Sequence, residues 1–186
     1  MESVDKRKHR REFFALAGPN IVSNLAVPVA GLVDIAILGH LDDIAPLAGV
    51  ALATVIFDFA YTGCNFLRMS TTGLVAAAHG SGDLRASATV FFRSLLIALL
   101  VGVGLLAGQV LLADGAFYLL QGGAEVEEAG RAYFHARIWG APATLCSYVC
   151  LGWLLGNGYA RIALQVSLLL NGMNVVLSAL LVYGLR

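Results

Sequence analysis

The fold class is decided by residues 94–113, which read SLLIALLVGVGLLAGQVLLA and contain no charged side chain. A helix needs roughly 20 mostly apolar residues to cross a hydrocarbon core about 30 Å thick, and this stretch is long enough. Three further runs without charge are of similar length: 13–33, 138–160 and 162–185. The sequence therefore predicts an all-α integral membrane protein.

The composition of the whole chain supports the same class. Of the 186 residues, 59% are hydrophobic and 13% are charged, whereas a soluble domain is about half apolar and a quarter charged. Twelve basic residues balance twelve acidic ones, so no excess of positive charge points to nucleic acid. The three cysteines form no CxxC pair, and we predict neither a disulfide framework nor a metal site.

Charged and turn-forming residues divide the chain into a basic tail, 1–12, and five predicted membrane helices. These helices cover about 13–39, 44–78, 87–113, 131–155 and 161–185. The first is predicted to be retained, because its apolar run exceeds the roughly 7–15 residues of a signal-peptide core. Lys and Arg collect in the tail and in the even-numbered loops, while the odd-numbered loops are acidic. The positive-inside rule therefore predicts a cytoplasmic N-terminus and a multi-pass topology.

Three of the predicted helices carry a polar face. Charge inside a bilayer costs about 2.5–3.5 kcal/mol on insertion scales, so polar residues at that depth are candidates for function. Hydrogen bonding between helices explains one or two such residues per helix, but three continuous stripes indicate the lining of a chamber. The stripes consist of Asn20, Ser23 and Asp34 on the first helix, Asp58, Thr62, Asn65 and Thr72 on the second, and Ser167, Asn171, Asn174 and Ser178 on the fifth.

Asp34 is the candidate for proton chemistry within this chamber. A carboxylate in a partly dry site has its charged form penalised, so its pKa rises from about 3.9 toward the physiological range. The alternative is a carboxylate held permanently by hydrogen bonds to neighbouring amides. Arg68 is expected at the inner interface with a structural role, and Gly104-x-x-x-Gly108 is a weak signal of close helix packing. His135 is expected to make an interfacial hydrogen bond.

Three strings carry a family resemblance. They are GLVDIAILGHL at 31–41, FLRMSTTGL at 66–74 and LGWLLGNGYAR at 151–161. In order, they resemble the end of the first helix, the second helix and the fourth-to-fifth connector of the multidrug and toxic compound extrusion (MATE) family, in its DNA-damage-inducible protein F (DinF) branch. The similarity extends over nearly the whole chain from about Phe13.

The resemblance implies a fold of twelve helices in two six-helix lobes, and cation-driven export of amphipathic or cationic drugs across the bacterial inner (plasma) membrane. The chain would then be the N-terminal lobe without its sixth helix, and it would need a second lobe for alternating access. The family's coupling aspartate falls on Asp34, and its fifth-helix pattern falls on Asn174 and Ser178. Because Ser178 replaces an acid or amide of that pattern, proton coupling is favoured over sodium. No cofactor is expected.

The residues leave other functions open. A lipid-linked flippase of the wider superfamily would be expected to show a cluster of cationic residues in the cavity, where the sequence offers only Arg68. A membrane-embedded enzyme would need a nucleophile beside a base, and no catalytic Ser/His pair is found, so we do not predict an enzyme. An inactive truncated fragment or a structural membrane protein is the third alternative, because one lobe cannot rock against another that is absent.

Overall fold

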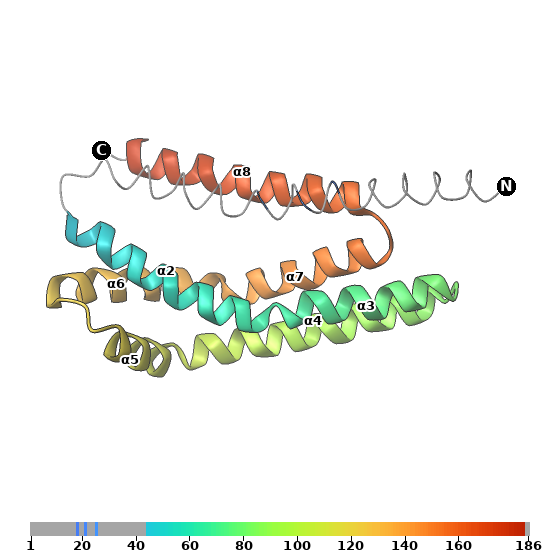
Figure 1. Cartoon of the computed structure of the whole chain (residues 1–186), viewed down its shortest axis with the longest axis horizontal. Helices are drawn as coiled ribbons and strands as arrows, with labels where there is room; N and C mark the ends of the chain where they lie inside the picture. The colour runs from blue at the N-terminus through green and yellow to red at the C-terminus, as the bar shows by residue number, and fades with distance from the viewer. Residues whose placement is uncertain (1–17, 19–20, 22–24, 26–43, 185–186) are drawn as a thin grey trace, which may run out of the picture. The chain divides into compact units, whose positions relative to one another are not determined.

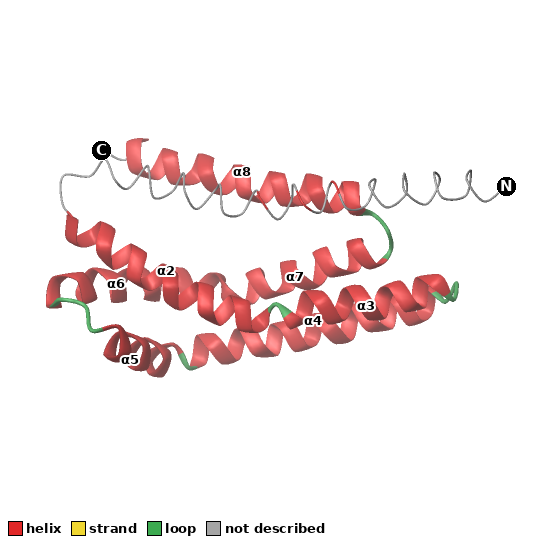
Figure 2. Cartoon of the chain, in the orientation of Figure 1, coloured by secondary structure: helices red, strands yellow, loops and turns green. Residues whose placement is uncertain are grey.

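The computed structural model describes residues 18, 21, 25 and 44–184. The described residues form helices joined by short loops and contain no strand, as Figure 2 shows. This agrees with the all-α membrane class predicted from the sequence. The first predicted helix, including Asn20 and Asp34, falls outside the described residues apart from the three isolated positions.

The chain divides into two compact units. One unit is Leu41–Gly156, and the other contains Met1–His40 and Asn157–Arg186. The first unit contains α2 to α7, whereas α8 (Ala160–Gly184) belongs to the second. Figure 1 labels these helices along the chain. Each unit is described below by itself.

Three helical stretches among the described residues are long and apolar enough to cross a membrane. They are Pro46–Gly80, Leu84–Ala107 and Ala124–Gly156. They correspond to the second, third and fourth predicted spans, and α8 corresponds to the fifth. The second and fourth spans each contain a break in their helix, and the third span is followed by a further short helix.

The second span consists of α2 (Ile44–Cys64) and α3 (Phe66–Gly80), which are separated at Asn65. Pro46 lies in the first turn of α2, where a missing amide hydrogen costs no helical hydrogen bond. At the break, the Asn65 amide donates to the Thr62 carbonyl at 3.2 Å, three residues back rather than four. The turn is therefore tightened at this position, which changes the direction of the side chains beyond it.

The third span begins with a sharp turn and ends at a glycine. Gly82 has a φ of 73°, which L-residues with a side chain rarely adopt. Asp83 then caps α4 (Leu84–Ala107), because its carboxylate accepts from the Ala86 amide at 2.9 Å. The helix stops at Gly108, and α5 (Gln109–Leu120) follows. Part of the predicted third connector is therefore helical.

The fourth span consists of α6 (Ala124–Arg137), a 3₁₀ turn η1 (Ile138–Gly140) and α7 (Ala141–Gly156). Pro142 explains the interruption, since proline has no amide hydrogen and clashes with the preceding helical turn. Acidic residues lie in the first turn of α6 and His135 and Arg137 lie in its last turn, which suits the helix dipole at both ends.

Glycines bring the second and fourth spans into close parallel contact. A Cβ at Gly49 would lie 2.7 Å from the Gly130 amide nitrogen, and a Cβ at Gly156 would lie 2.7 Å from the Val75 Cβ. A Cβ at Gly152 would lie 2.7 Å from the Arg68 carbonyl. Residues 49, 68 and 75 of the second span meet residues 130, 152 and 156 of the fourth span, in the same order. The two spans therefore run in the same direction, as expected when one crossing separates them.

The unit Leu41–Gly156 has two clusters of buried apolar residues. One joins α2, α5, α6 and α7 and is formed by Ala53, Phe57, Ala113, Phe117, Phe134, Ile138 and Ala141. The other joins α2, α3, α4 and α7 and is formed by Cys64, Leu67, Ala98, Leu145 and Val149. In the first cluster the Phe57 and Phe134 rings stack with centroids 5.0 Å apart. Two cores thus stabilise the two halves of one bundle.

The glycine contact expected from Gly104 and Gly108 is absent from the part of the chain that the structure describes. A Cβ at Gly104 would have no neighbour within 4 Å, and Gly108 is at the end of α4. The close approach is made by Gly152 and Gly156 on α7, which have the same spacing and face α3. On α4, the contacting glycine is Gly102, whose added Cβ would lie 2.5 Å from the Pro142 Cα.

Candidate functional site

The polar groups at membrane depth in the first unit gather around Tyr148 of α7. Asp58, Tyr61 and Arg68 all lie within electrostatic range of the Tyr148 hydroxyl. Tyr61 and Tyr148 are both about half-buried, and Asp58 is exposed. The second and fourth spans therefore contribute jointly to one polar face, which contains a carboxylate, a guanidinium and two aromatic hydroxyls.

Thr144 and Arg137 lie nearer the N-terminal end of the fourth span than Tyr148 does. Thr144 lies near the Tyr61 hydroxyl, and its own hydroxyl donates to the Gly140 carbonyl at 3.0 Å. Arg137 lies above the Phe57 ring, with its Cζ 5.0 Å from the ring centroid, and its Nη1 donates to the Tyr133 hydroxyl at 2.8 Å. Among the described residues, Arg137 therefore contacts aromatic groups of α2 and α6.

The structure brings together only part of the predicted second-helix stripe. Asp58 lies on the polar face around Tyr148, but Asn65 is the residue at which the helix breaks, and both are exposed. Thr72 donates its hydroxyl to the Arg68 carbonyl at 2.8 Å, so this polar group is satisfied within its own helix. The break at Asn65 is the reason why the regular helical spacing of the stripe does not continue.

The fifth-helix stripe lies on α8 in the other unit. Ser167 is buried, and Asn171 is half-buried and donates its Nδ2 to the Ser167 carbonyl at 2.8 Å. Asn174 is exposed. The side chains of Ser178, Asn20 and Asp34 lie outside what the structure describes. Their assignment to a common chamber with Asp58 stays a prediction from the sequence.

Sequence reasoning missed Tyr61, Thr144 and Tyr148. A signal was present, because Thr144 and Tyr148 are four residues apart and share a helix face. The predicted polar stripes contain no tyrosine, and no polar face was predicted for the fourth span. The contact of α3 and α7 through Gly152 could have been suspected from the glycine spacing alone.

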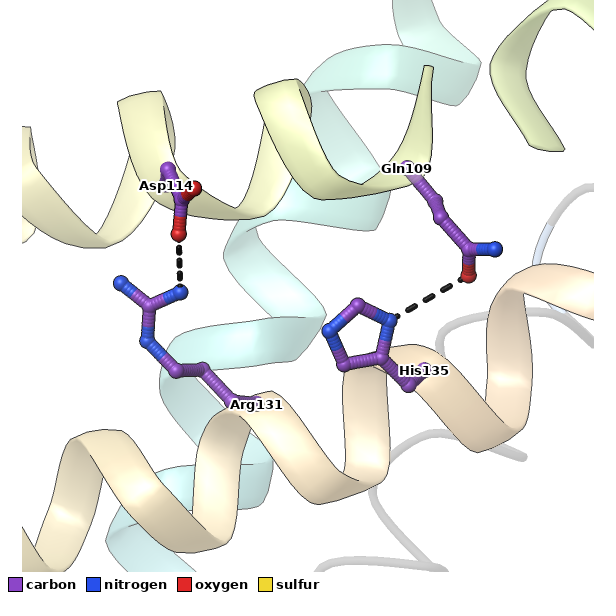
Figure 3. Close-up of polar contacts among 4 residues, drawn as sticks. All are labelled: Gln109, Asp114, Arg131 and His135. Atoms are coloured by element: carbon purple, nitrogen blue, oxygen red, sulfur yellow. Dashed lines mark hydrogen bonds and ion pairs between the residues drawn. The ribbon is translucent and has the colours of Figure 1, made fainter. Parts of the chain in front are cut away.

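A second group of polar contacts ties α5 to α6, as Figure 3 shows. Arg131 donates to the Asp114 carboxylate, and its guanidinium lies 5.1 Å from the centroid of the Phe117 ring. One helical turn further on, the His135 Nδ1 and the Gln109 Oε1 are 3.2 Å apart. The hydrogen bond expected for His135 is therefore present. An open cavity of about 500 Å³ adjoins these ties, lined by Asp114, Phe117, Tyr118, Gln121, Gly122, Glu127 and Arg131.

The described residues contain no group of three or more His, Cys, Asp or Glu side chains that could bind a metal ion. The chemistry available on the polar face is that of binding. A carboxylate attracts an organic cation, and aromatic rings stabilise it through cation–π contacts of about 0.5–2 kcal/mol each. Polar side chains from two packed spans thus form a surface suited to an amphipathic ligand.

The bundle of apolar helices, with polar side chains along one face, defines a multi-pass membrane protein. Residues 19–180 match the family described as MatE, and the chain belongs to that family. This establishes the resemblance that the three sequence strings indicated.

The comparisons with individual proteins cover most of this chain but a smaller share of each relative. The chain is 41% identical over 171 residues to DNA damage-inducible protein F of Escherichia coli (strain K12), covering 92% of the chain and 37% of that protein. It is 28% identical to a probable multidrug resistance protein NorM of Thermotoga maritima, covering 94% and 38%. The chain therefore spans less than two fifths of the length of these relatives.

The fold is similar to that of solved transporter structures. A structure described as the outward-facing conformation of a multidrug resistance MATE family transporter of the MOP superfamily superposes with a TM-score of 0.85 at 24% identity. The match covers 94% of this chain and 38% of that one. The coverage agrees with a chain that corresponds to most of one lobe.

Proposed function

We propose that this chain forms most of the first lobe of a proton-coupled antiporter that exports cationic or amphipathic drugs across the bacterial inner membrane. Membership of the MatE family supports transport rather than catalysis. The observation that carries the substrate class is the polar face around Tyr148, where Asp58 provides negative charge beside two tyrosines. The proposal includes a second lobe as the partner against which this lobe moves.

Proton coupling is assigned to Asp34, with Asn171, Asn174 and Ser178 as neutral neighbours. Sodium binding usually requires several oxygen ligands with a carboxylate among them, as hard cations do generally. Ser178 supplies no such charge. The sodium gradient is therefore the less favoured driving force, and the proposal requires no cofactor.

Export of a cationic dye tests the substrate class directly. In the full-length transporter that contains this chain, Asp58→Asn should weaken export of the dye more than export of a neutral amphipathic compound. Asp114→Asn is a matched control, because Asp114 lies in the α5–α6 ties and is paired with Arg131. Equal export by the wild type and Asp58→Asn would exclude Asp58 from substrate recognition.

Two substitutions of Tyr148 test whether its ring binds the cationic substrate. Tyr148→Phe keeps the ring, whereas Tyr148→Ala removes it. Loss of a cation–π contact of about 0.5–2 kcal/mol corresponds to about a two- to thirtyfold rise in the KM for the cationic dye. We expect this rise for Tyr148→Ala and a smaller change for Tyr148→Phe. Similar losses in both variants would assign the role to the hydroxyl instead.

A further inference from the structure

The helix α5 has a side with polar contacts and an exposed apolar side, which do not ordinarily occur at the same depth in a membrane. One surface is tied to the charged helix α6 through Asp114–Arg131 and Gln109–His135. The opposite surface exposes large apolar side chains, with Leu111 and Leu119 each 81% exposed and Tyr118 79% exposed. A protein surface in water rarely exposes such side chains together, and a charged helix is rarely found within hydrocarbon.

Four of the exposed apolar residues of α5 form one strip, whereas Val110 and Leu120 lie outside it. At 100° per residue, Leu111, Leu112, Tyr118 and Leu119 fall within about 120° of one another, and the arc between them contains only Gly115. Ala113 and Phe117, both fully buried, face the bundle. Asp114 lies on the flank of the strip, on the side of Arg131. The helix is therefore apolar on both its buried and its exposed face, and its polar side chains Gln109 and Asp114 bind α6.

The position of α5 follows from the length of α4 before it. The 24 residues of α4 measure about 36 Å at 1.5 Å per residue, which exceeds a hydrocarbon core of about 30 Å. The span is thus complete where the chain breaks at Gly108. The paired helix α6 carries Glu125, Glu127 and Glu128, which places this level of the bundle at the membrane surface rather than inside it.

The exposed apolar side of α4 also supports a position of α5 at the membrane surface. Its exposed apolar residues follow helical spacing along one side: Phe92, Leu96, Leu99, Leu100 and Val103. This strip lies on a helix long and apolar enough to span the bilayer, and the exposed apolar strip of α5 follows it in the chain. The 12 residues of α5 are too few to cross the bilayer, and apolar segments of this length are buried, re-entrant or interfacial. The exposure of Leu111, Tyr118 and Leu119 favours the interface. Tyr118 is of the residue type enriched at that boundary.

We propose that α5 is an interfacial helix that inserts its Leu111–Tyr118–Leu119 face into the outer leaflet of the bilayer. The occupant of this face is lipid, at the depth where acyl chains join the headgroups. The ties to α6 hold the helix against the bundle, so that the lobe and the outer leaflet are mechanically connected. The inference does not depend on the transported substrate or on the coupling ion.

Quenching of tryptophan fluorescence by brominated lipid tests this placement. In the full chain, Trp139 and Trp153 are replaced by Phe, and a single tryptophan is introduced as Leu111→Trp or, more conservatively, as Tyr118→Trp. Glu128→Trp on the exposed side of α6 is the control for water, and Leu100→Trp on α4 is the control for the acyl region. Each variant is reconstituted in phosphatidylcholine brominated either near the headgroup or near the chain ends.

The proposal predicts that bromine near the headgroup lowers emission of Leu111→Trp and Tyr118→Trp by about twofold or more, with less quenching by bromine near the chain ends. Glu128→Trp should be almost unaffected, and Leu100→Trp should respond more to the deeper bromine. Quenching of the α5 tryptophans no stronger than that of Glu128→Trp would overturn the proposal, because water or protein would then cover this face. Stronger quenching by the deeper bromine would also overturn it, because α5 would then continue the transmembrane span.

Discussion

Gly152 of α7 lies directly against Thr71 of α3, so that a Cβ at position 152 would stand 3.1 Å from the Thr71 Cβ. Thr71 is fully buried at this crossing. The same added atom would lie 2.7 Å from the Arg68 carbonyl, which belongs to the backbone and cannot rotate away. Small residues at helix crossings let backbones approach closely, and helix association in membranes depends on such packing. The parallel contact of the second and fourth spans therefore depends on the absence of a side chain here.

Substitution of this glycine should destabilise the bundle. Gly152→Ala is expected to cost about 1–3 kcal/mol, the usual penalty for overpacking a close-packed interface. Unfolding of the purified protein in mixed detergent, followed by circular dichroism, measures the change.

Gly104→Ala is the matched control. Gly104 also lies within a helix, but a Cβ there would meet no described residue within 4 Å. Replacing a helical glycine with alanine gains about 0.5–1 kcal/mol when nothing obstructs the side chain. Equal destabilisation by both substitutions would contradict the assignment of the close contact to Gly152.

The Arg131–Asp114 ion pair between α5 and α6 should contribute less to stability than the Phe117 ring beside it. Phe117 is fully buried in the first core cluster, so Phe117→Ala should cost about 3–5 kcal/mol. The Arg131–Asp114 pair has side chains 35% and 61% exposed, and pairs of this kind contribute about 0.2–1 kcal/mol. A double-mutant cycle with Arg131→Gln and Asp114→Asn measures the pair. A coupling energy larger than the loss of unfolding free energy in Phe117→Ala would reverse this ranking.

Topology can be tested by labelling single cysteines from outside the cell. In a background where Cys64, Cys146 and Cys150 are replaced by Ala, Ala124→Cys should react with a membrane-impermeant maleimide. Ser81→Cys should react only after the membrane is opened. Ser81 is chosen over its neighbour because Gly82 has a φ of 73° and tolerates a side chain poorly. Labelling of Ser81→Cys in intact cells with protection of Ala124→Cys would invert the orientation.

The sequence predicted the class of the fold because charge placement directly reflects the membrane. The runs without charge at 94–113 and 138–160 coincide largely with α4 and α7. Periodicity did not reveal the breaks at Asn65 and Gly108, since apolar residues continue on both sides of each. The second half of α5 was also missed, because residues 114–120 were placed in the loop between the predicted helices 87–113 and 131–155.

The candidate site could be predicted only in part. Asp58 was identified because a carboxylate within an apolar run has a high free-energy cost in the bilayer, which makes it a candidate for function. Tyr61 and Tyr148 were missed, because tyrosine suits both apolar packing and polar contact, and only the three-dimensional contact of α2 with α7 distinguishes the two uses. Arg137 was read as part of an apolar span, and its position above the Phe57 ring depends on tertiary packing.

The central claim is that Asp34 couples export to the entry of protons. Drug transport is measured with the full-length protein in proteoliposomes, under an imposed pH gradient at constant sodium and then under a sodium gradient at constant pH. We predict that the pH gradient alone drives transport and that Asp34→Asn abolishes it, since the amide keeps the shape of the carboxyl group but cannot carry a proton. Transport by Asp34→Asn at the wild-type rate under the pH gradient, or transport by the wild type under the sodium gradient alone, would contradict the claim.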